Sequence, residues 1–316
     1  MSAPPGSARP ASRRPPMAVA VRAVVNEVQV SGRFISNDVW TTVLPATAFV
    51  LAAARHSGHT GGRIAVDFLC GALYFWLYIY GFTLTNQLYG VEEDRVNKPF
   101  RPLVTGRSSY RGAQRRAVVV LLLFPAVAWW LGVLFWALAW EATYLLTNVA
   151  RWERHWFLKN LSMGIGVTVQ LAAAWTIVAP LTPSAWRWVI TLAVSIWLLI
   201  PLQDLRDVKG DLVNDRRTFP IALGERFTRA YLATGFALLP VVVHLLLLEP
   251  SASPWKYPLE AVLAAISWLV AVRVVGPRSP PGPPPPHPGV ARRPPAPTTP
   301  GRLLHRETAR EPGLCR

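Results

Sequence analysis

The chain has 316 residues, of which 52% are hydrophobic and only 16% are charged. This balance excludes an ordinary soluble domain, in which about a quarter of the residues are charged. The net charge of +16 would suit nucleic acid only on a soluble basic face, and the long apolar runs leave no room for one, so we exclude a nucleic-acid partner. Two cysteines, Cys70 and Cys315, are too few for a disulfide framework or a zinc site.

The N-terminal 33 residues are basic and rich in proline, which predicts a disordered extension. Eight apolar segments follow, most of them long enough to cross about 30 Å of hydrocarbon. They occupy residues 39–54, 65–88, 117–131, 133–149, 157–179, 184–203, 228–248 and 257–275. We expect the chain to reverse between Trp129 and Gly132, within the long apolar stretch. The fold class predicted is all-α: a polytopic transmembrane helical bundle of about eight spans.

The domain organisation follows from these segments. Residues 34–275 form the predicted transmembrane catalytic domain. Residues 276–316 hold thirteen of the thirty prolines, and so polar and proline-rich a tail is expected to be disordered. Whether this tail stands in place of a ninth span is left open.

Basic residues indicate the orientation. Of the 33 Lys and Arg residues, 29 lie in one alternating set of connections, which includes both ends of the chain. The positive-inside rule therefore predicts cytoplasmic termini and cytoplasmic loops after the second and sixth segments. We expect an integral membrane protein of a bacterial cell membrane.

Acidic residues gather in the same two loops, which contain seven of the seventeen. The first loop follows the second apolar segment. Asn86, Gly90 and Asp94 lie there at i, i+4 and i+8, which places them on one face of a helix. Glu93 lies beside them.

The second acidic loop follows the sixth apolar segment. Asp204, Asp207 and Asp211 lie there at i, i+3 and i+7, again on one helix face. Two such faces at the same depth are able to meet across a bundle.

Carboxylate and amide oxygens without Cys or His suit Mg²⁺, which proteins usually share with a substrate phosphate. The predicted metal ligands are Asn86, Glu93, Asp94, Asp204, Asp207 and Asp211, and the predicted catalytic carboxylates are Asp94, Asp207 and Asp211. The predicted diphosphate-binding residues are the basic residues between them, Arg95, Lys98, Arg101, Arg206 and Lys209. The alternative is two solvated loops with ordinary charge pairs.

The two loops resemble the signature motifs of the UbiA superfamily of intramembrane prenyltransferases. The resemblance rests on Asn86, Asp94, Arg101-Pro102-Leu103 and Gly106, and on Asp204, Asp207, Gly210-Asp211, Thr218, Pro220 and Gly224. It covers residues 35–275. It implies a bundle of usually nine spans around a cavity open to lipid, with two Mg²⁺ ions that hold a prenyl diphosphate. It also implies that Lys159, beside Asn160, reaches the diphosphate.

Gly90 departs from the superfamily pattern, which usually has Asp at this position. The variant resembles the branch of UbiA-type terpene cyclases. We therefore predict a terpene cyclase, with a prenyltransferase acting on an aromatic or other lipophilic acceptor as the alternative. A membrane transporter is a remote alternative, because the acids cluster with basic partners in loops rather than along a path through the membrane.

Four residues are predicted to line the cavity: Trp76, Tyr89, Glu141 and Trp175. Aromatic rings stabilise carbocations by cation–π contact, although packing or lipid contact is the commoner role of a single ring. Asp67 is interpreted as interfacial and His244 as a packed residue. The predicted partners are a prenyl diphosphate and the lipid bilayer, and the sequence indicates no obligate protein partner.

Overall fold

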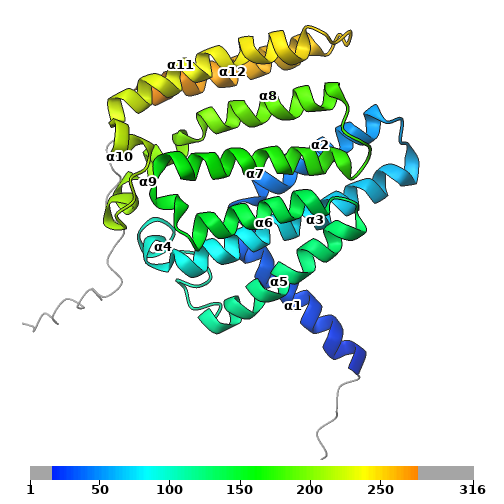
Figure 1. Ribbon diagram of the computed structural model, residues 1–316, viewed down its shortest axis with the longest axis vertical. Coiled ribbons are helices and arrows are strands. Elements are labelled where there is room, and N and C mark those ends of the chain that lie inside the picture. Colours follow the sequence, from blue (N-terminus) through cyan, green and yellow to red (C-terminus); the bar gives the residue numbers. More distant parts are fainter. Residues whose placement is uncertain (1–15, 277–316) are drawn as a thin grey trace, which may run out of the picture. The chain divides into compact units, whose positions relative to one another are not determined.

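The computed structural model describes residues 16–276, and that part of the chain contains helices and no strand (Figure 1). The long helices are α1 (Pro16–Ile35), α2 (Leu44–His56), α3 (Gly61–Tyr89), α5 (Tyr110–Trp130), α6 (Leu134–Asn148), α7 (Trp156–Thr176), α8 (Pro183–Leu199), α9 (Pro201–Val213), α11 (Glu225–Val243) and α12 (Lys256–Val275). The short helices are α4 (Val91–Asn97), α10 (Phe219–Leu223), the 3₁₀ turn η2 (Trp152–Arg154) and the π-helical turns η1 (Val39–Val43) and η3 (His244–Leu248). The all-helical prediction is confirmed.

Helix α1 corrects the prediction of a disordered N-terminal extension for residues 16–33. Its polar side chains bind α3: the Tyr80 hydroxyl donates to Glu27 Oε1 at 3.0 Å, and Trp76 Nε1 donates to Ser31 Oγ at 3.1 Å. The proline-rich composition ends at Pro16, and the Ala- and Val-rich run beyond it forms a helix with few breakers. Residues 1–15 and the predicted disordered tail from 277 lie outside the described residues.

Among residues 16–276, five helical segments are long and apolar enough to cross a membrane: Gly61–Tyr89, Tyr110–Trp130, Pro183–Leu212, Glu225–Leu248 and Lys256–Val275. Helices α2 and α6, with 13 and 15 residues, are shorter than the roughly 20 residues of an average span. The count of eight spans therefore stays a prediction. The predicted reversal is confirmed, because α5 ends at Trp130 and Gly132 turns the chain with φ of 73°.

The long helices pack side by side around α3 and α7. Helix α3 contacts α1, α2, α5 and α6, while α7 contacts α2, α6 and α8, and α11 pairs with α12 (Figure 1). Aromatic residues fill the centre, where the rings of Tyr78 and Trp140 stack at 4.5 Å. The Tyr78 hydroxyl donates to the Gly166 carbonyl at 2.7 Å, and a Cβ on Gly166 would lie 2.6 Å from the Trp140 ring. A side chain at residue 166 would thus disturb this core.

Helices α4, α9 and α10 gather at one end of the bundle (Figure 1). Gly90 separates α3 from α4, and Pro201 occupies the first turn of α9, where its missing N–H costs no helical hydrogen bond. Both acidic motifs therefore lie where one helix gives way to a shorter one, α3 to α4 and α8 to α9.

Candidate functional site

The first motif is built around the ion pair of Asp94 with Arg101. Arg101 Nη1 lies 2.7 Å from both carboxylate oxygens of Asp94 and donates to Asn86 Oδ1 at 2.9 Å. Both charged side chains are buried. Burial raises the pKa of Asp94, and the Arg101 guanidinium opposes that rise. The pair draws the end of α3, helix α4 and the following loop together.

The second motif places two of its three aspartates inside the protein. Asp204 is fully buried on α9, and Lys159 Nζ of α7 lies 2.6 Å from its Oδ1. Asp211 is also fully buried and accepts a hydrogen bond from Thr218 Oγ1 at 3.1 Å. Asp207 is partly exposed and pairs with its neighbour Arg206 at 3.0 Å. The predicted face of α9 thus presents Asp204 and Asp211 inward, with Asp207 at its margin.

Arg216 joins the two motifs. Its Nη1 lies 2.6 Å from Glu93 Oε2 in α4 and 3.9 Å from Asp211 Oδ1 in α9. Its Nη2 lies 3.8 Å from Glu153 Oε1 in η2. Sequence reasoning missed Arg216 and Glu153 as site residues, because a contact between segments so far apart leaves no mark in local spacing.

A close backbone approach brings α4 against α9. The Asn97 side-chain amide occupies the space that a Cβ on Gly210 would take. Asn97 Nδ2 is buried there without a hydrogen-bond partner in the described structure. Because glycine alone leaves this space, Gly210 permits the two acidic motifs to meet.

Several acceptor oxygens at this end of the bundle are buried and unsatisfied. Asp204 Oδ2, Asp211 Oδ1, Asn160 Oδ1 and Glu153 Oε2 have no hydrogen-bond partner among residues 16–276. Such oxygens, three of the four from carboxylates, suit a hard cation such as Mg²⁺. Within the same range, however, no three His, Cys, Asp or Glu side chains form one metal-binding group. Lys159, Arg101 and Arg216 pair with carboxylates of this cluster, and the predicted set of six metal ligands stays a prediction.

The predicted diphosphate-binding residues fall into two groups. Arg101 and Lys159 are paired with the acidic cluster, and Lys98 lies within electrostatic reach of Asp94 and Asp207. Burial, with the nearby Arg101 charge, lowers the pKa of Lys98. Lys209 is exposed, and the exposed Arg95 pairs with Glu92 at 2.9 Å. Within the described part of the chain, Arg206 pairs with Asp207 alone.

The four predicted cavity residues lie in separate places. Trp76 bonds to α1, as described above, and Tyr89 is 56% exposed at the end of α3. Trp175 lies near the far end of α7 from Lys159, where its ring centroid is 5.8 Å from that of Phe49. Their role as one cavity lining stays a prediction.

Glu141 is the fourth predicted cavity residue. It is buried in the aromatic core and accepts a hydrogen bond from the Tyr144 hydroxyl at 3.3 Å. Two further singled-out residues have partners: Asp67 pairs with His59 at 2.6 Å, and His244 pairs with Glu260 of α12 at 2.7 Å.

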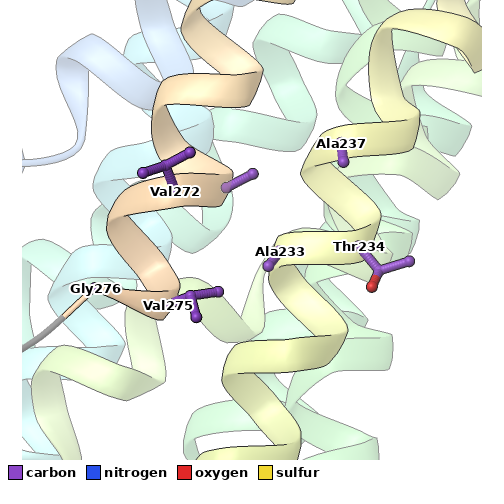
Figure 2. A pocket seen from close by; sticks show the side chains of 7 residues that line it. Ala233, Thr234, Ala237, Val272, Val275 and Gly276 are labelled. Atoms are coloured by element: carbon purple, nitrogen blue, oxygen red, sulfur yellow. The ribbon is translucent and has the colours of Figure 1, made fainter.

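A shallow groove between α11 and α12 is lined by small and apolar side chains (Figure 2). Ala233, Ala237 and Val272 lie along it, together with Thr234. It contains no acidic or basic side chain, so it does not suit a diphosphate.

The model of the UbiA prenyltransferase family matches residues 42–284. The chain belongs to this family. It is 52% identical over 255 residues to "Somaliensene A/B synthase" of Streptomyces somaliensis, a match that covers 80% of this chain and 85% of the relative. It is 33% identical to "Diterpene cyclase eriG" of Hericium erinaceus, covering 81% of this chain and 82% of that protein. The protein is thus a membrane enzyme of the UbiA family, whose members similar to it are terpene synthases and prenyltransferases.

The fold is that of solved UbiA homologues. The structure of a UbiA homologue from Archaeoglobus fulgidus bound to GPP and Mg²⁺ matches with a TM-score of 0.58. The match covers 77% of this chain and 86% of that one, at 15% sequence identity. At so low an identity the likeness concerns the fold alone.

In this UbiA enzyme, Gly90 sits at the C-terminal cap of α3, where its N–H donates to the Asn86 carbonyl at 2.8 Å. A Cβ at residue 90 would lie 2.8 Å from that carbonyl oxygen and 3.6 Å from Glu93 Oε2. A longer side chain requires a local shift of the backbone. Glycine therefore fits the backbone at residue 90, whereas the aspartate usual in the superfamily would require the backbone to shift.

Proposed function

We propose that this enzyme is a Mg²⁺-dependent terpene cyclase, which ionises a prenyl diphosphate and closes rings within the released prenyl chain. The observation that carries the proposal is the convergence of buried carboxylates from α4 and α9 with cations from α7 and from the loop after α4, joined by Arg216. Both signs of charge are what a metal–diphosphate complex requires, because the metal needs anionic oxygens and the diphosphate needs cations.

Asp94, Asp204 and Asp211, with Asn86, Glu93 and Asp207 beside them, would hold Mg²⁺. When bound, the metal supplies Lewis-acid stabilisation of the leaving diphosphate. The catalytic carboxylates in this proposal are Asp94, Asp207 and Asp211.

Arg101, Lys159 and Lys98 bind and orient the diphosphate oxygens. They stabilise the negative charge that develops as the C–O bond breaks and the diphosphate takes both electrons of that bond. Arg216 lies close enough to Glu93 and Asp211 to hold both in place. These residues are in position before the bond breaks, which is how preorganised charge lowers a barrier.

The allylic cation then reacts within its own chain. A double bond of the prenyl group donates its π electrons to the cation and forms a ring, and loss of a proton or capture of water ends the reaction. The similarity to the somaliensene synthase and the diterpene cyclase over four fifths of the chain supports this outcome over transfer. Gly90 supports it as well, because it matches the cyclase-like variant of the first motif.

Transfer of the prenyl group to a lipophilic acceptor is the second candidate. The chain is also 33% identical to "Polyprenyl transferase eriF" of Hericium erinaceus, over 68% of this chain and 75% of that protein. Ionisation of the diphosphate is common to both reactions, and only the nucleophile differs.

We infer a location in a bacterial cell membrane with the acidic motifs on the cytoplasmic side. Basic residues support this orientation, since 29 of the 33 lie in the connections assigned to that side.

The experiment that tests the proposal uses the purified chain in lipid nanodiscs with Mg²⁺ and a panel of prenyl diphosphates of increasing length, without an acceptor. We expect a cyclic hydrocarbon or alcohol, identified by gas chromatography and mass spectrometry. Product formation only after an aromatic acceptor is added would contradict cyclisation and support transfer.

A further inference from the structure

A second basic site lies on the outer side of the bundle, in a pocket between α9, α11 and α12. Arg206, Arg229 and Arg273 line it, one from each helix, together with apolar side chains that include Leu205 and Val270. The lining of this pocket holds three cations and apolar side chains but no carboxylate, unlike the acidic site.

Arg206 lines this pocket and lies outside the buried face of α9. Asp204 and Asp211 occupy the buried face of α9, whereas the Arg206 side chain is 73% exposed. Its one ion-pair partner in the described structure is Asp207, at the margin of the buried face.

Arg229 fixes the pocket in place. Its Nε donates to Glu225 Oε1 at 2.9 Å, and its Nη1 donates to the Val274 carbonyl in the last turn of α12. The guanidinium thus caps the C-terminal end of α12 and joins it to α11.

Arg273 supplies an uncompensated charge. It lies in the last turn of α12 and has no hydrogen-bond or ion-pair partner in the part of the chain that the structure describes. The three arginines face two carboxylates, those of Asp207 and Glu225, so one positive charge is left over. An anion is the ligand that this surplus favours.

We propose that the pocket binds the phosphate head group of an amphiphile, with the acyl or prenyl chain along the apolar side chains. The pocket lies at the ends of three segments long enough to span a membrane, where hydrocarbon meets head groups. Arginine forks bind phosphate oxygens in pairs, and basic pockets between transmembrane helices hold anionic lipid head groups in this way. The source is an anionic phospholipid or a prenyl diphosphate outside the acidic site.

Native mass spectrometry of the full chain tests this proposal. The protein is equilibrated in mixed micelles that contain equal amounts of phosphatidylglycerol and phosphatidylcholine, and in a second arm with farnesyl thiolodiphosphate, which resists ionisation. The variant is Arg273→Gln, the charge-retaining variant is Arg273→Lys, and the control is Arg187→Gln, an exposed arginine at the other end of the bundle.

If the ligand is a phospholipid, Arg273→Gln lowers the preferential retention of phosphatidylglycerol about tenfold, the loss expected for one charge-assisted hydrogen bond. If the ligand is the diphosphate, Arg273→Gln lowers the number of bound analogue molecules from two to one. In either case Arg273→Lys gives an intermediate result and Arg187→Gln matches the wild type. Equal retention of both probes by Arg273→Gln and Arg187→Gln would overturn the proposal.

Discussion

The guanidinium of Arg216 lies 2.6 Å from the carboxylate of Glu93, and this contact ties the second acidic motif to the first. Both side chains are nearly buried, with 10% and 11% of their surface exposed. A buried ion pair is costly to break from one side, because the remaining charge loses its partner without regaining water.

Removal of the Arg216 charge is therefore expected to damage both stability and activity. Arg216→Gln should cost about 3 kcal/mol of stability and lower turnover about 100-fold, as loss of one preorganised charge does. Thermal unfolding in detergent and product formation measure the two effects.

Arg217→Gln is the matched control, since the Arg217 side chain is exposed. The double variant Arg216→Gln/Glu93→Gln should recover part of the lost stability, because it leaves no unpaired carboxylate at residue 93. Equal stability of Arg216→Gln and the double variant would show that the unpaired Glu93 carboxylate is not the source of the lost stability.

Gly210→Ala tests the close approach of α4 to α9. The added methyl group overlaps the Asn97 amide, and overpacking of this kind costs about 1–3 kcal/mol. We expect a lower melting temperature and a lower turnover, and recovery of both in Gly210→Ala/Asn97→Ala. Gly62→Ala is the control, because a Cβ there meets no atom within 4 Å. Failure of the second substitution to restore turnover would argue against this contact as the cause.

Gly90→Asp restores the aspartate that the superfamily usually has at this position of the first motif. Gly90→Ala separates the effect of the Cβ, which crowds the Asn86 carbonyl, from the effect of a new carboxylate near Glu93. Relative to Gly90→Ala, the aspartate should lower the Mg²⁺ concentration for half-maximal turnover, since an added carboxylate strengthens a hard-cation site. An identical Mg²⁺ dependence of the two variants would show that residue 90 lies away from the metal.

Lys98 predicts a pH dependence of substrate binding. Its pKa is lowered by burial and by the charge of Arg101, so its positive charge is lost below the ordinary lysine pKa of 10.5. The KM for the prenyl diphosphate should accordingly rise with pH earlier in the wild type than in Lys98→Arg, which keeps its charge. The effect of pH on stability has the opposite sign to its effect on substrate binding. The unfolded chain binds the Lys98 proton more tightly than the folded chain, so folding becomes more favourable as pH rises through the folded-state pKa of Lys98. If KM changes with pH in the same way in the wild type and in Lys98→Arg, Lys98 does not bind the diphosphate.

Local spacing predicted the parts of this molecule that depend on one helix at a time. Asp204 and Asp211 share a buried face of α9 as their i, i+7 spacing indicates, and the reversal at Gly132 follows from a glycine in a long apolar run. Spacing did not indicate that Arg206 lines a pocket with residues of α11 and α12, because the neighbours of a helix are not encoded in its own residue spacing.

Contacts between distant segments escaped prediction. Arg216 meets Glu93 only where α4 and α9 pack together, and Glu27 of α1 has its partners on α3 and α5. Arg116 of α5, for example, holds Glu27 of α1 at 2.8 Å. Proline content alone therefore extended the predicted disorder too far.

The most direct test of the account is the stoichiometry of diphosphate release to cyclic product, measured in nanodiscs with Mg²⁺ and a prenyl diphosphate but no acceptor. The account predicts one diphosphate for each cyclic molecule in the wild type. It predicts neither product in Asp94→Asn or Asp211→Asn, and near-normal turnover in Asp215→Asn, an exposed position whose φ of 56° suits asparagine equally well. Full turnover by Asp211→Asn, or release of diphosphate only when an acceptor is present, would contradict it.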